Sequence, residues 1–503
     1  MRKTKLLALS AVLSLAVLLA LLLLAEASAP DATIVSIPSA LWYLLTTLTT
    51  VGYGDCYPVT AAGKAIGAVF QLMSLGVLAL LIGLLAAFLR GTAWERLRLL
   101  RRSGKTWYVF SEKNEASLAL AAALAREDPK RALLFADTKD DCAVGTGSPL
   151  RAEALCKRKK DGDFLLFCLS ENETENERLA NRVTNGRVYC SSSLLPDRLP
   201  ENQQRFDPKE LCARQYWNRF PLQSKTERIL LAGDGAYAAA LFEQGLLRNV
   251  LDPAQKVRYV CAGDWSDFLR LHPQLDAALA IDPACDGKDE LTVLRHWDDD
   301  PVLLQTADRI VFCWDDEAEN RLAVRQLRRC FAAAGAVQAR LSAPIEGAVC
   351  FGAPDEIYTP ALVLHEELSA LAIALNERYR AAHPGAPAWK DLTDFARRSN
   401  LAAADHLQVK LRLLGGKDGR ETALARYQNA DAEEKDRLRR IEHARWSRFH
   451  YLNGWRCGAA RDEQGRLHPM LVPFDQLSAA EREKDDYGWE LLSVLEGEPN
   501  DEN

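Results

Sequence analysis

Two long apolar runs near the N-terminus constrain the fold of this chain most. Residues 6–25 carry no charge, and residues 62–89 are interrupted only by Lys64 and Gln71. A helix that rises ~1.5 Å per residue crosses a hydrocarbon core of about 30 Å in roughly twenty residues. Both runs therefore predict membrane-spanning helices.

Basic residues orient these two runs. Lys and Arg occur at residues 2–5 and 90–105 but nowhere in residues 6–63. Cytoplasmic flanks of membrane helices carry such an excess, so we expect a multi-pass protein of the cell inner (plasma) membrane with both termini cytoplasmic and residues 26–61 outside. The first run also fits a signal peptide, because Ala27-Ser28-Ala29 resembles a cleavage site. Its length and the second run favour a retained span.

Between the runs stands the sequence Thr49-Thr50-Val51-Gly52-Tyr53-Gly54-Asp55. A dehydrated potassium ion needs rings of oxygen in place of its water, and successive carbonyls of residues 50–54 could supply them. The two glycines permit backbone angles at which consecutive carbonyls point the same way. Irregular backbone at this depth is tolerated only where it lines a water-filled path. The segment therefore predicts an ion-conducting pore.

These seven residues resemble the selectivity filter of tetrameric potassium channels. The resemblance implies that K⁺ is the permeant ion and that four identical chains in a lipid bilayer build one pore. It assigns the filter to Thr50, Val51, Gly52, Tyr53, Gly54 and Asp55, and beyond K⁺ there we expect no metal site.

The flanks of the filter fit this assignment. Pro38 predicts the start of a short helix that continues to residue 48 and aims its negative end at the cavity. The resemblance implies that Trp42 and Tyr43 brace the filter. Glu26, Asp31 and Asp55 make the outer entrance acidic, which attracts cations.

Gly76 and Gly83 lie inside the second run and are candidate gating hinges. Close packing between helices explains them equally well. Neither run carries a ladder of arginines, so a voltage sensor of the repeated-arginine kind is excluded.

The remaining residues have the composition of folded cytosolic domains. The chain has 503 residues, of which 48% are hydrophobic and 26% charged, and its net charge of -6 argues against a nucleic-acid partner. Of its twelve cysteines, eleven follow residue 102 without any CxxC pair, which favours a reduced compartment.

Residues 105–355 alternate short apolar runs with helical patterns, which predicts α/β doubly wound parallel sheets. Phe167-Cys168 with Glu175-Asn176 recurs as Phe312-Cys313 with Glu319-Asn320, which predicts two Rossmann-like units at 105–224 and 225–355. A pore followed by such units resembles the RCK family. The resemblance implies a ring of regulatory domains beneath the pore, in which ligand binding pulls the inner helices apart.

A dinucleotide site is expected in at most one of these units. The first unit lacks the glycines of a phosphate loop. The second has a GxGxxA loop with Gly233 and Gly235, whose backbone could approach a phosphate, although Asp234 lies inside it. Tight packing of strand against helix is the alternative. The acidic clusters 298–300 and 315–317 lack calcium-loop spacing.

The C-terminal part resembles the RyR domain, the repeat found in ryanodine receptors. The resemblance rests on Glu442-His443-Ala444-Arg445-Trp446, Gly454-Trp455-Arg456-Cys457-Gly458 and His468-Pro469. A mix of cations and aromatic rings suits an anionic ligand with a stackable base. The candidate ligand residues are His443, Arg445, Trp446, Trp455, Arg461 and His468. For each of them a place in the core, and for the domain a protein contact, are the alternatives.

The predicted organisation is a pore at 1–95, a linker at 96–104, the two units, a helical linker at 356–395, a mainly α RyR domain at 396–495 and an acidic tail at 496–503. The predicted function is a homotetrameric potassium channel, not an enzyme, gated by a cytoplasmic small molecule of the nucleotide class. A membrane-anchored NAD-dependent oxidoreductase and a pore regulated by a protein partner are the alternatives.

Overall fold

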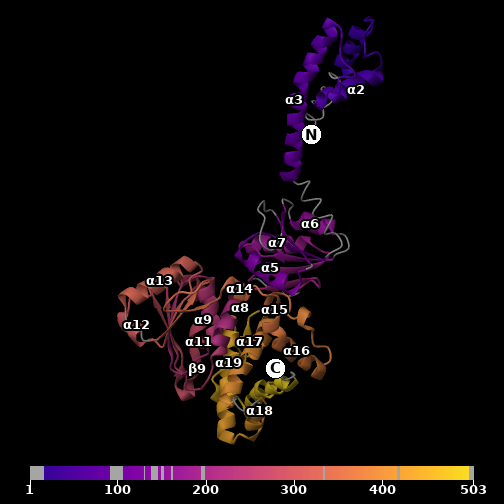
Figure 1. The fold of residues 1–503 in the computed structure, drawn as a ribbon. Helices are drawn as coiled ribbons and strands as arrows, with labels where there is room; N and C mark the ends of the chain where they lie inside the picture. Colours follow the sequence, from indigo (N-terminus) through magenta and orange to yellow (C-terminus); the bar gives the residue numbers. More distant parts are fainter. Residues whose placement is uncertain are drawn as a thin grey trace. The chain divides into compact units, whose positions relative to one another are not determined.

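The computed structural model describes residues 16–90, 106–129, 131–136, 146–148, 152–159, 163–193, 199–331, 333, 335–415 and 420–497. The chain divides into two compact units, Met1–Gly104 and Lys105–Asn503 (Figure 1). We call them the N-terminal and C-terminal units and describe each by itself.

The N-terminal unit contains helices α2 (Ile37–Leu48) and α3 (Ala61–Arg90). Ser36 caps α2 and Pro38 lies in its first turn, so the predicted short helix is present. Tyr43, Leu44 and Phe70 belong to the buried core of the N-terminal unit. Within the described ranges, no helix is long and apolar enough to cross a membrane. Residues 6–15, half of the first predicted span, lie outside the described residues.

Glu26 is buried rather than exposed at the outer entrance, so the expectation of a free carboxylate there was wrong. Its two oxygens accept hydrogen bonds from the amides of Val59 and Thr60 at 2.9 and 3.0 Å, and from the Thr60 hydroxyl at 2.6 Å. The carboxylate therefore caps the start of α3, where the exposed N–H groups of a helix favour negative charge.

The first sheet of the C-terminal unit consists of six parallel strands in the order β3-β2-β1-β4-β5-β6. The strands are β1 (Trp107–Phe110), β2 (Ala132–Ala136), β3 (Thr146–Ser148), β4 (Phe164–Cys168), β5 (Arg187–Ser191) and β6 (Gln203–Phe206). The connecting helices are α5 (Glu115–Glu127), α6 (Ala152–Arg158) and α7 (Glu173–Arg182), and α8 (Pro208–Arg219) leads to the next sheet.

The second sheet repeats this topology in the order β11-β8-β7-β12-β13-β14. The strands are β7 (Arg228–Ala232), β8 (Arg258–Ala262), β11 (Glu290–Leu294), β12 (Arg309–Phe312), β13 (Ala336–Arg340) and β14 (Val349–Phe351). The helices between them are α9 (Ala236–Arg248), α10 (Ser266–Leu271), α11 (Leu275–Leu279), α12 (Pro301–Thr306) and α13 (Glu317–Cys330), and β9 (Ala280–Asp282) pairs with β10 (Gly287–Lys288). Two doubly wound parallel sheets are thus confirmed.

The sequence repeat has a structural cause, a buried asparagine in each copy. Asn176 accepts from the amide of Ser170 and donates to its carbonyl, both at 2.8 Å, and Asn320 does the same with Trp314 at 2.8 and 2.9 Å. Each side-chain amide also donates to the last carbonyl of the next strand, β5 or β13, at 3.0 and 3.1 Å. The asparagine therefore ties a strand end, a helix and the neighbouring strand together in both sheets.

The helical linker predicted at 356–395 is not one continuous helix. The chain instead forms α14 (Pro354–Ile357), α15 (Pro360–Val363), a 3₁₀ turn and α16 (Ala370–Ala382), because Pro360 starts a new helix and Glu366 takes a positive φ of 49°. The segment α14–α15 crosses back to the first sheet, where Gln204 donates to the carbonyl of Val363 at 2.8 Å and Tyr358 packs edge-on against Phe206. We call this segment the strap.

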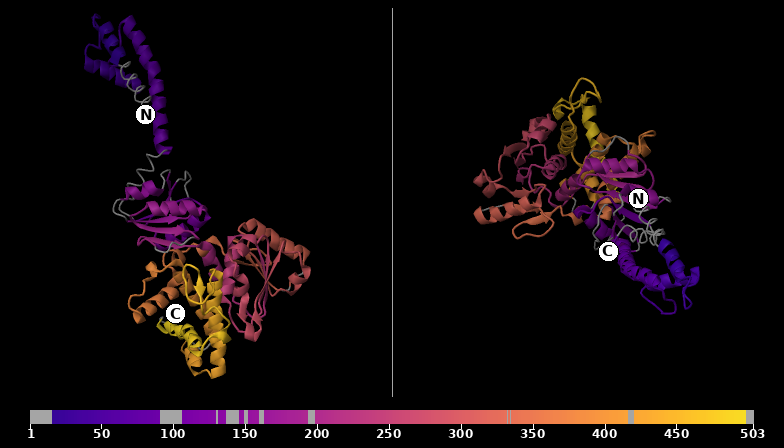
Figure 2. Two further views of the ribbon diagram at one scale, coloured as in Figure 1. Left: turned by 180° about the vertical axis from the view of Figure 1, so that it is seen from behind. Right: turned by 90° about the horizontal axis from the view of Figure 1, so that it is seen from above.

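The C-terminal helices are α17 (Asp394–Leu413), α18 (Arg420–Asn429) and α19 (Ala432–Leu452), followed by β15 (Arg456–Cys457) and β16 (Leu467–His468). The segment 478–494 does not form one continuous helix. That segment forms α20 (Ala479–Arg482), α21 (Asp486–Glu490) and 3₁₀ turns. Helices α17 and α19 pack against α9 of the second sheet (Figure 2), so these helices share a core with it.

Candidate functional site

The filter segment alternates its backbone conformation from residue to residue. Thr50, Gly52 and Gly54 have φ of 60°, 53° and 76°, whereas Val51 and Tyr53 are not in this region. The amides of Val51 and Gly52 both donate to the carbonyl of Thr46, the last buried residue of α2, at 2.9 and 3.1 Å. Opposite conformations at alternate residues turn consecutive carbonyls to one side, which is the geometry that a cation path needs.

Trp42 braces this segment and Tyr43 does not. The Trp42 indole donates to Asp55 Oδ2 at 2.8 Å and stacks on Tyr53 with ring centroids 5.7 Å apart and an angle of 3°. Tyr43 packs edge-on against Phe70 of α3, at 6.4 Å between centroids. Trp42 therefore links α2 to both ends of the Tyr53–Asp55 turn, and the assignment of residues 50–55 as a filter stays a prediction.

Gly76 and Gly83 both lie inside α3. A Cβ atom added to Gly83 would meet no described atom within 4 Å. Within one chain, packing against a neighbour therefore does not explain this glycine, and its role as a hinge stays a prediction.

The GxGxxA loop of the second unit already holds an anion, the side chain of Asp315. Its carboxylate accepts hydrogen bonds from the amides of Ala236 and Tyr237, both at 3.1 Å. A Cβ atom on Gly235 would lie 2.4 Å from the Asp315 carboxylate carbon, and one on Gly233 would lie 2.8 Å from a backbone carbon of Cys313. The glycines thus admit Asp315 and the β12 backbone, so the expectation that they cradle a phosphate does not fit this arrangement.

The first unit closes its equivalent loop with Asn114. Asn114 Oδ1 accepts from the amide of Ser117 at 2.9 Å, and its Nδ2 donates to the carbonyl of Leu169 at 2.6 Å. The start of α5 is therefore capped from within, as the missing glycines predict.

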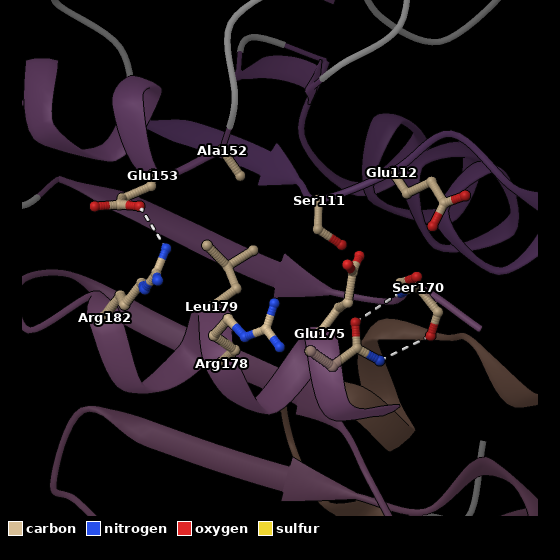
Figure 3. A pocket seen from close by; sticks show the side chains of 10 residues that line it. Ser111, Glu112, Ala152, Glu153, Ser170, Glu175, Arg178, Leu179 and Arg182 are labelled. Carbon is tan, nitrogen blue, oxygen red and sulfur yellow. Dashed lines mark hydrogen bonds and ion pairs between the residues drawn. The ribbon is translucent and has the colours of Figure 1, made fainter. Parts of the chain in front are cut away.

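A cavity of about 530 Å³ lies beside this loop, at the carboxyl ends of β1 and β4. Ser111 and Ser170 follow these two strands, and the side chains of Arg178 and Arg182 project from α7 (Figure 3). Arg182 pairs with Glu153 at 3.5 Å. Ligands of open parallel sheets bind where the strand order reverses, which is the place of this cavity.

Four of the six RyR-domain candidates come together, with one histidine that the sequence analysis missed. Trp446 on α19 stacks near His443 at 5.9 Å, tilts over His450 at 4.1 Å and meets His468 edge-on at 4.9 Å. His450 packs against buried Trp455 at 5.5 Å. We call these five residues the Trp446 cluster. His450 follows His443 by two helical turns, a spacing that could have indicated it.

Trp446 is the partly exposed member of the cluster, whereas the other four are buried. Burial lowers the pKa of His443 and His468, and that of His450 to about 3. The positive charge of Arg461 acts on His468 in the same direction. The imidazoles are therefore neutral donors and acceptors at neutral pH, with an aromatic plate between them.

Arg445 and Arg461 lie outside the cluster. Arg445 is buried and bonds to both oxygens of Glu442 at 3.1 and 3.0 Å, while Lys410 contacts the same carboxylate at 2.7 Å. Burial acts to raise the pKa of Glu442, but Arg445 and Lys410 outweigh it and hold that pKa far below its usual range. Arg461 is exposed and pairs with Glu463 at 2.7 Å. Arg445 is therefore a structural cation.

Asp485 completes this buried charge group. Its carboxylate lies 3.7 Å from His443 Nδ1, and both atoms lack a hydrogen-bond partner among the described residues. Burial and the nearby charge of Glu442 raise the pKa of Asp485 to about 8. The protonated acid is thus the favoured form at neutral pH.

Arg448, which the sequence analysis also missed, joins α19 to the second sheet. It is fully buried and donates to the carbonyls of Ala278 and Leu246 at 2.7 and 2.9 Å and to Asp289 at 2.9 Å. Burial raises the pKa of Asp289, against the effect of Arg448. Further contacts across this boundary are Arg214–Asp405, Arg398–Glu243, Arg440–Asp282 and His406–Val250.

Two family matches agree with these local structures. Residues 7–91 match the family described as Ion channel, and residues 421–495 match the RyR domain. The chain thus carries an ion-channel segment and a RyR domain.

Curated relatives match a short part of this chain. A human protein named potassium voltage-gated channel subfamily A member 6 is 45% identical over 56 residues, 11% of each chain. A voltage-gated potassium channel of Aeropyrum pernix is 48% identical over 54 residues, 11% of this chain and 18% of that one. This chain thus matches only a small part of the length of these relatives.

Solved structures of the GsuK channel are similar at 14% identity. One covers 74% of this chain and 86% of the other with a TM-score of 0.37, and the L97D mutant covers 72% and 99% with a TM-score of 0.36.

Proposed function

We propose that this protein is a potassium-selective channel of four identical chains in the inner membrane, gated by a cytoplasmic ligand of the nucleotide class. The observation that carries the proposal is the alternating backbone of residues 50–54, fixed by Trp42 through Asp55. A packed core does not require a loop of this conformation, whereas four copies of it around an axis would line a path with carbonyl oxygens.

The Trp446 cluster is the proposed ligand site. A partly exposed indole offers a face for a base, and the neutral imidazoles supply hydrogen bonds. Two cations, Arg461 and Lys484, and one anion, Glu463, act electrostatically on His468, so positive charge is in excess near the cluster and favours a phosphate there.

Ligand binding at this cluster has a short route to the rest of the C-terminal unit. Trp446 and Arg448 lie on the same helix, α19, and Arg448 is anchored in the second sheet. We infer that the two Rossmann-like units transmit the change to the pore, as RCK modules do. A ligand opens or closes the gate only as far as it binds the two states differently.

The filter is tested by Gly52→Ala. We expect this variant, reconstituted in liposomes, to lose K⁺ flux, because a non-glycine residue at positive φ costs about 1–2 kcal/mol in each chain and misdirects a carbonyl. A fluorescent dye reports the flux of K⁺ and of Na⁺. Addition of valinomycin at the end gives the maximum K⁺ flux, to which the signal is calibrated.

Val35→Ala is the control, because it shortens an exposed side chain of the same unit that lies outside the filter segment. It should keep selective K⁺ passage. Unchanged flux in Gly52→Ala, or no K⁺ flux in the wild type under any ligand, would refute the channel.

The ligand site is tested by Trp446→Leu. Loss of stacking should weaken the response of K⁺ flux to the activating or inhibiting nucleotide by about tenfold or more, since stacking is worth about 1–3 kcal/mol per base. Tyr487→Leu removes another exposed aromatic residue of the same domain and should leave the response unchanged. A response to a protein partner but to no nucleotide would favour the regulated-pore alternative.

A further inference from the structure

A second cavity, of about 630 Å³, lies at the carboxyl edge of the second sheet. Its walls come from the segments after β7, β8, β11 and β12, and they include Asp234, Asp264, Arg295, Trp297 and Trp314. The strand order reverses between β7 and β12, so the cavity occupies the position where parallel sheets of this kind bind ligands.

The anion position next to this cavity is taken. Asp315 accepts from the first amides of α9, as described above, and its loop is held in place by Arg340. Arg340 is buried, donates to the carbonyl of Asp315 and lies over the Tyr237 ring at 4.3 Å. A phosphate at the start of α9 would have to displace a fixed carboxylate and would meet its charge.

A carboxylate suited to hydroxyl groups, that of Asp264, also lines the cavity. Asp264 follows β8, the second strand of the unit, where the dinucleotide fold places the acid that accepts hydrogen bonds from ribose. The Ser266 amide donates to Asp264 Oδ1 at 3.0 Å, and the Asp264 amide donates to Asp234 Oδ2 at 3.0 Å. Hydrogen bonds from Ser266 lower the pKa of Asp264, so it is ionised and oriented.

Two indoles supply the apolar walls. Trp314 lies nearly parallel to Phe312, with centroids 6.0 Å apart and an angle of 14°, and Asn320 holds its backbone on both sides. Buried Trp297 meets Phe312 edge-on at 5.2 Å. A ring fixed in this way is a preorganised platform for a base.

We propose that this cavity binds a nucleoside, a base on a ribose with free hydroxyls, and discriminates against the corresponding 5′-phosphates. The site is separate from the Trp446 cluster and goes beyond the function proposed above. Asp264 selects the ribose, Trp314 stacks the base, and Asp315 excludes the phosphate.

Equilibrium dialysis of adenosine, guanosine, AMP and GMP tests this assignment on the full-length Trp446→Leu variant in detergent. In that variant the nucleotide site proposed at the Trp446 cluster is removed, so the binding measured is that of the cavity. We expect at least one nucleoside to bind saturably and its monophosphate to bind at least tenfold more weakly. Asp264→Asn and Trp314→Leu should each weaken nucleoside binding at least tenfold. Asp315→Ser keeps a helix-capping oxygen but removes its charge. It should reduce the difference in affinity between the nucleoside and its monophosphate.

Tyr487→Leu on the same background is the control, and it should leave nucleoside binding unchanged. Thermal unfolding of each variant shows whether it is folded, and the two independent substitutions, at Asp264 and at Trp314, keep the test decisive if one of them does not fold. The proposal is overturned if no nucleoside binds to the Trp446→Leu variant, or if the monophosphate binds to it as tightly as the nucleoside.

Discussion

Two buried side chains of the C-terminal unit, His406 and Asp485, have strongly shifted pKa values. His406 on α17 is fully buried, its Nε2 bonds to the carbonyl of Val250 at 2.9 Å, and burial and the nearby charge of Lys410 lower its pKa to about 3. Asp485 has its pKa raised to about 8. The two groups therefore respond to pH in opposite directions.

The sign for each group follows from proton uptake. Below pH ~6.5 the unfolded chain protonates its histidine and the folded chain does not, so stability is lost as the pH falls. Folded Asp485 keeps a proton from pH ~4 to 8 that the unfolded chain releases, so stability is lost as the pH rises. Each slope is at most about 1.4 kcal/mol per pH unit.

We predict that His406→Gln makes the acid-side loss of stability shallower and that Asp485→Asn removes the loss between neutral pH and pH ~8. Urea unfolding of the detergent-solubilised chain at a series of pH values measures both. Parallel changes in the two variants would contradict the assignment of these groups.

At this scale the sequence predicted residue types better than partners. His443, Trp446, Trp455 and His468 do meet, because one helix and the loop after it carry all four. Asp315 could not be found in this way. It reaches the Gly233 loop from another strand end, and a local GxGxxA pattern does not indicate what fills it.

At the scale of elements, the junction of α19 with the second sheet depends on Arg448. We predict that Arg448→Met costs about 3–5 kcal/mol of unfolding free energy, because it leaves Asp289 buried and unpaired. Arg448→Met combined with Asp289→Asn should recover part of this loss. Chemical denaturation measures both.

Arg461→Met is the matched control. Arg461 and Glu463 are both more than half exposed, and surface pairs contribute about 0–1 kcal/mol. Equal losses of unfolding free energy in the Arg448 and Arg461 variants would contradict a larger contribution of the buried ion pair.

Apolar runs predicted most of the central strands, but the buried strand β5 was missed along with the polar edge strands. The central strands, such as Phe164–Cys168 and Arg228–Ala232, read as buried runs because helices cover both faces. The edge strands Gln203–Phe206 and Glu290–Leu294 are partly exposed and polar, so they lack this pattern. Their positions follow from pairing with neighbours, which sequence periodicity does not report.

For the whole molecule, the C-terminal unit behaves as one body rather than a chain of modules. The hydrophobic core around the first and second sheets includes Ala402, Phe449 and Leu452 from the C-terminal helices. The predicted boundaries at 355 and 395 therefore do not separate independent cores, although they remain untested as domain limits.

We predict that a chain ending at residue 392 loses cooperative unfolding of the second sheet, because removal of α17 and α19 exposes α9 and leaves Asp289 unpaired. A chain ending at residue 497 is the control and should unfold like the full protein. Circular dichroism with temperature compares them. A sharp transition in the shorter chain would show that the RyR domain is a separable module.

The strap gives this body a mechanical property. The strap follows the second sheet and packs against β6, the edge strand of the first sheet, with Tyr358 against Phe206 and the Val363 carbonyl hydrogen-bonded to Gln204. Rotation of one sheet away from the other would break these contacts and expose the two rings to water. We therefore expect the two sheets to move together as a rigid pair, so that a rotation of one sheet is passed on to the other.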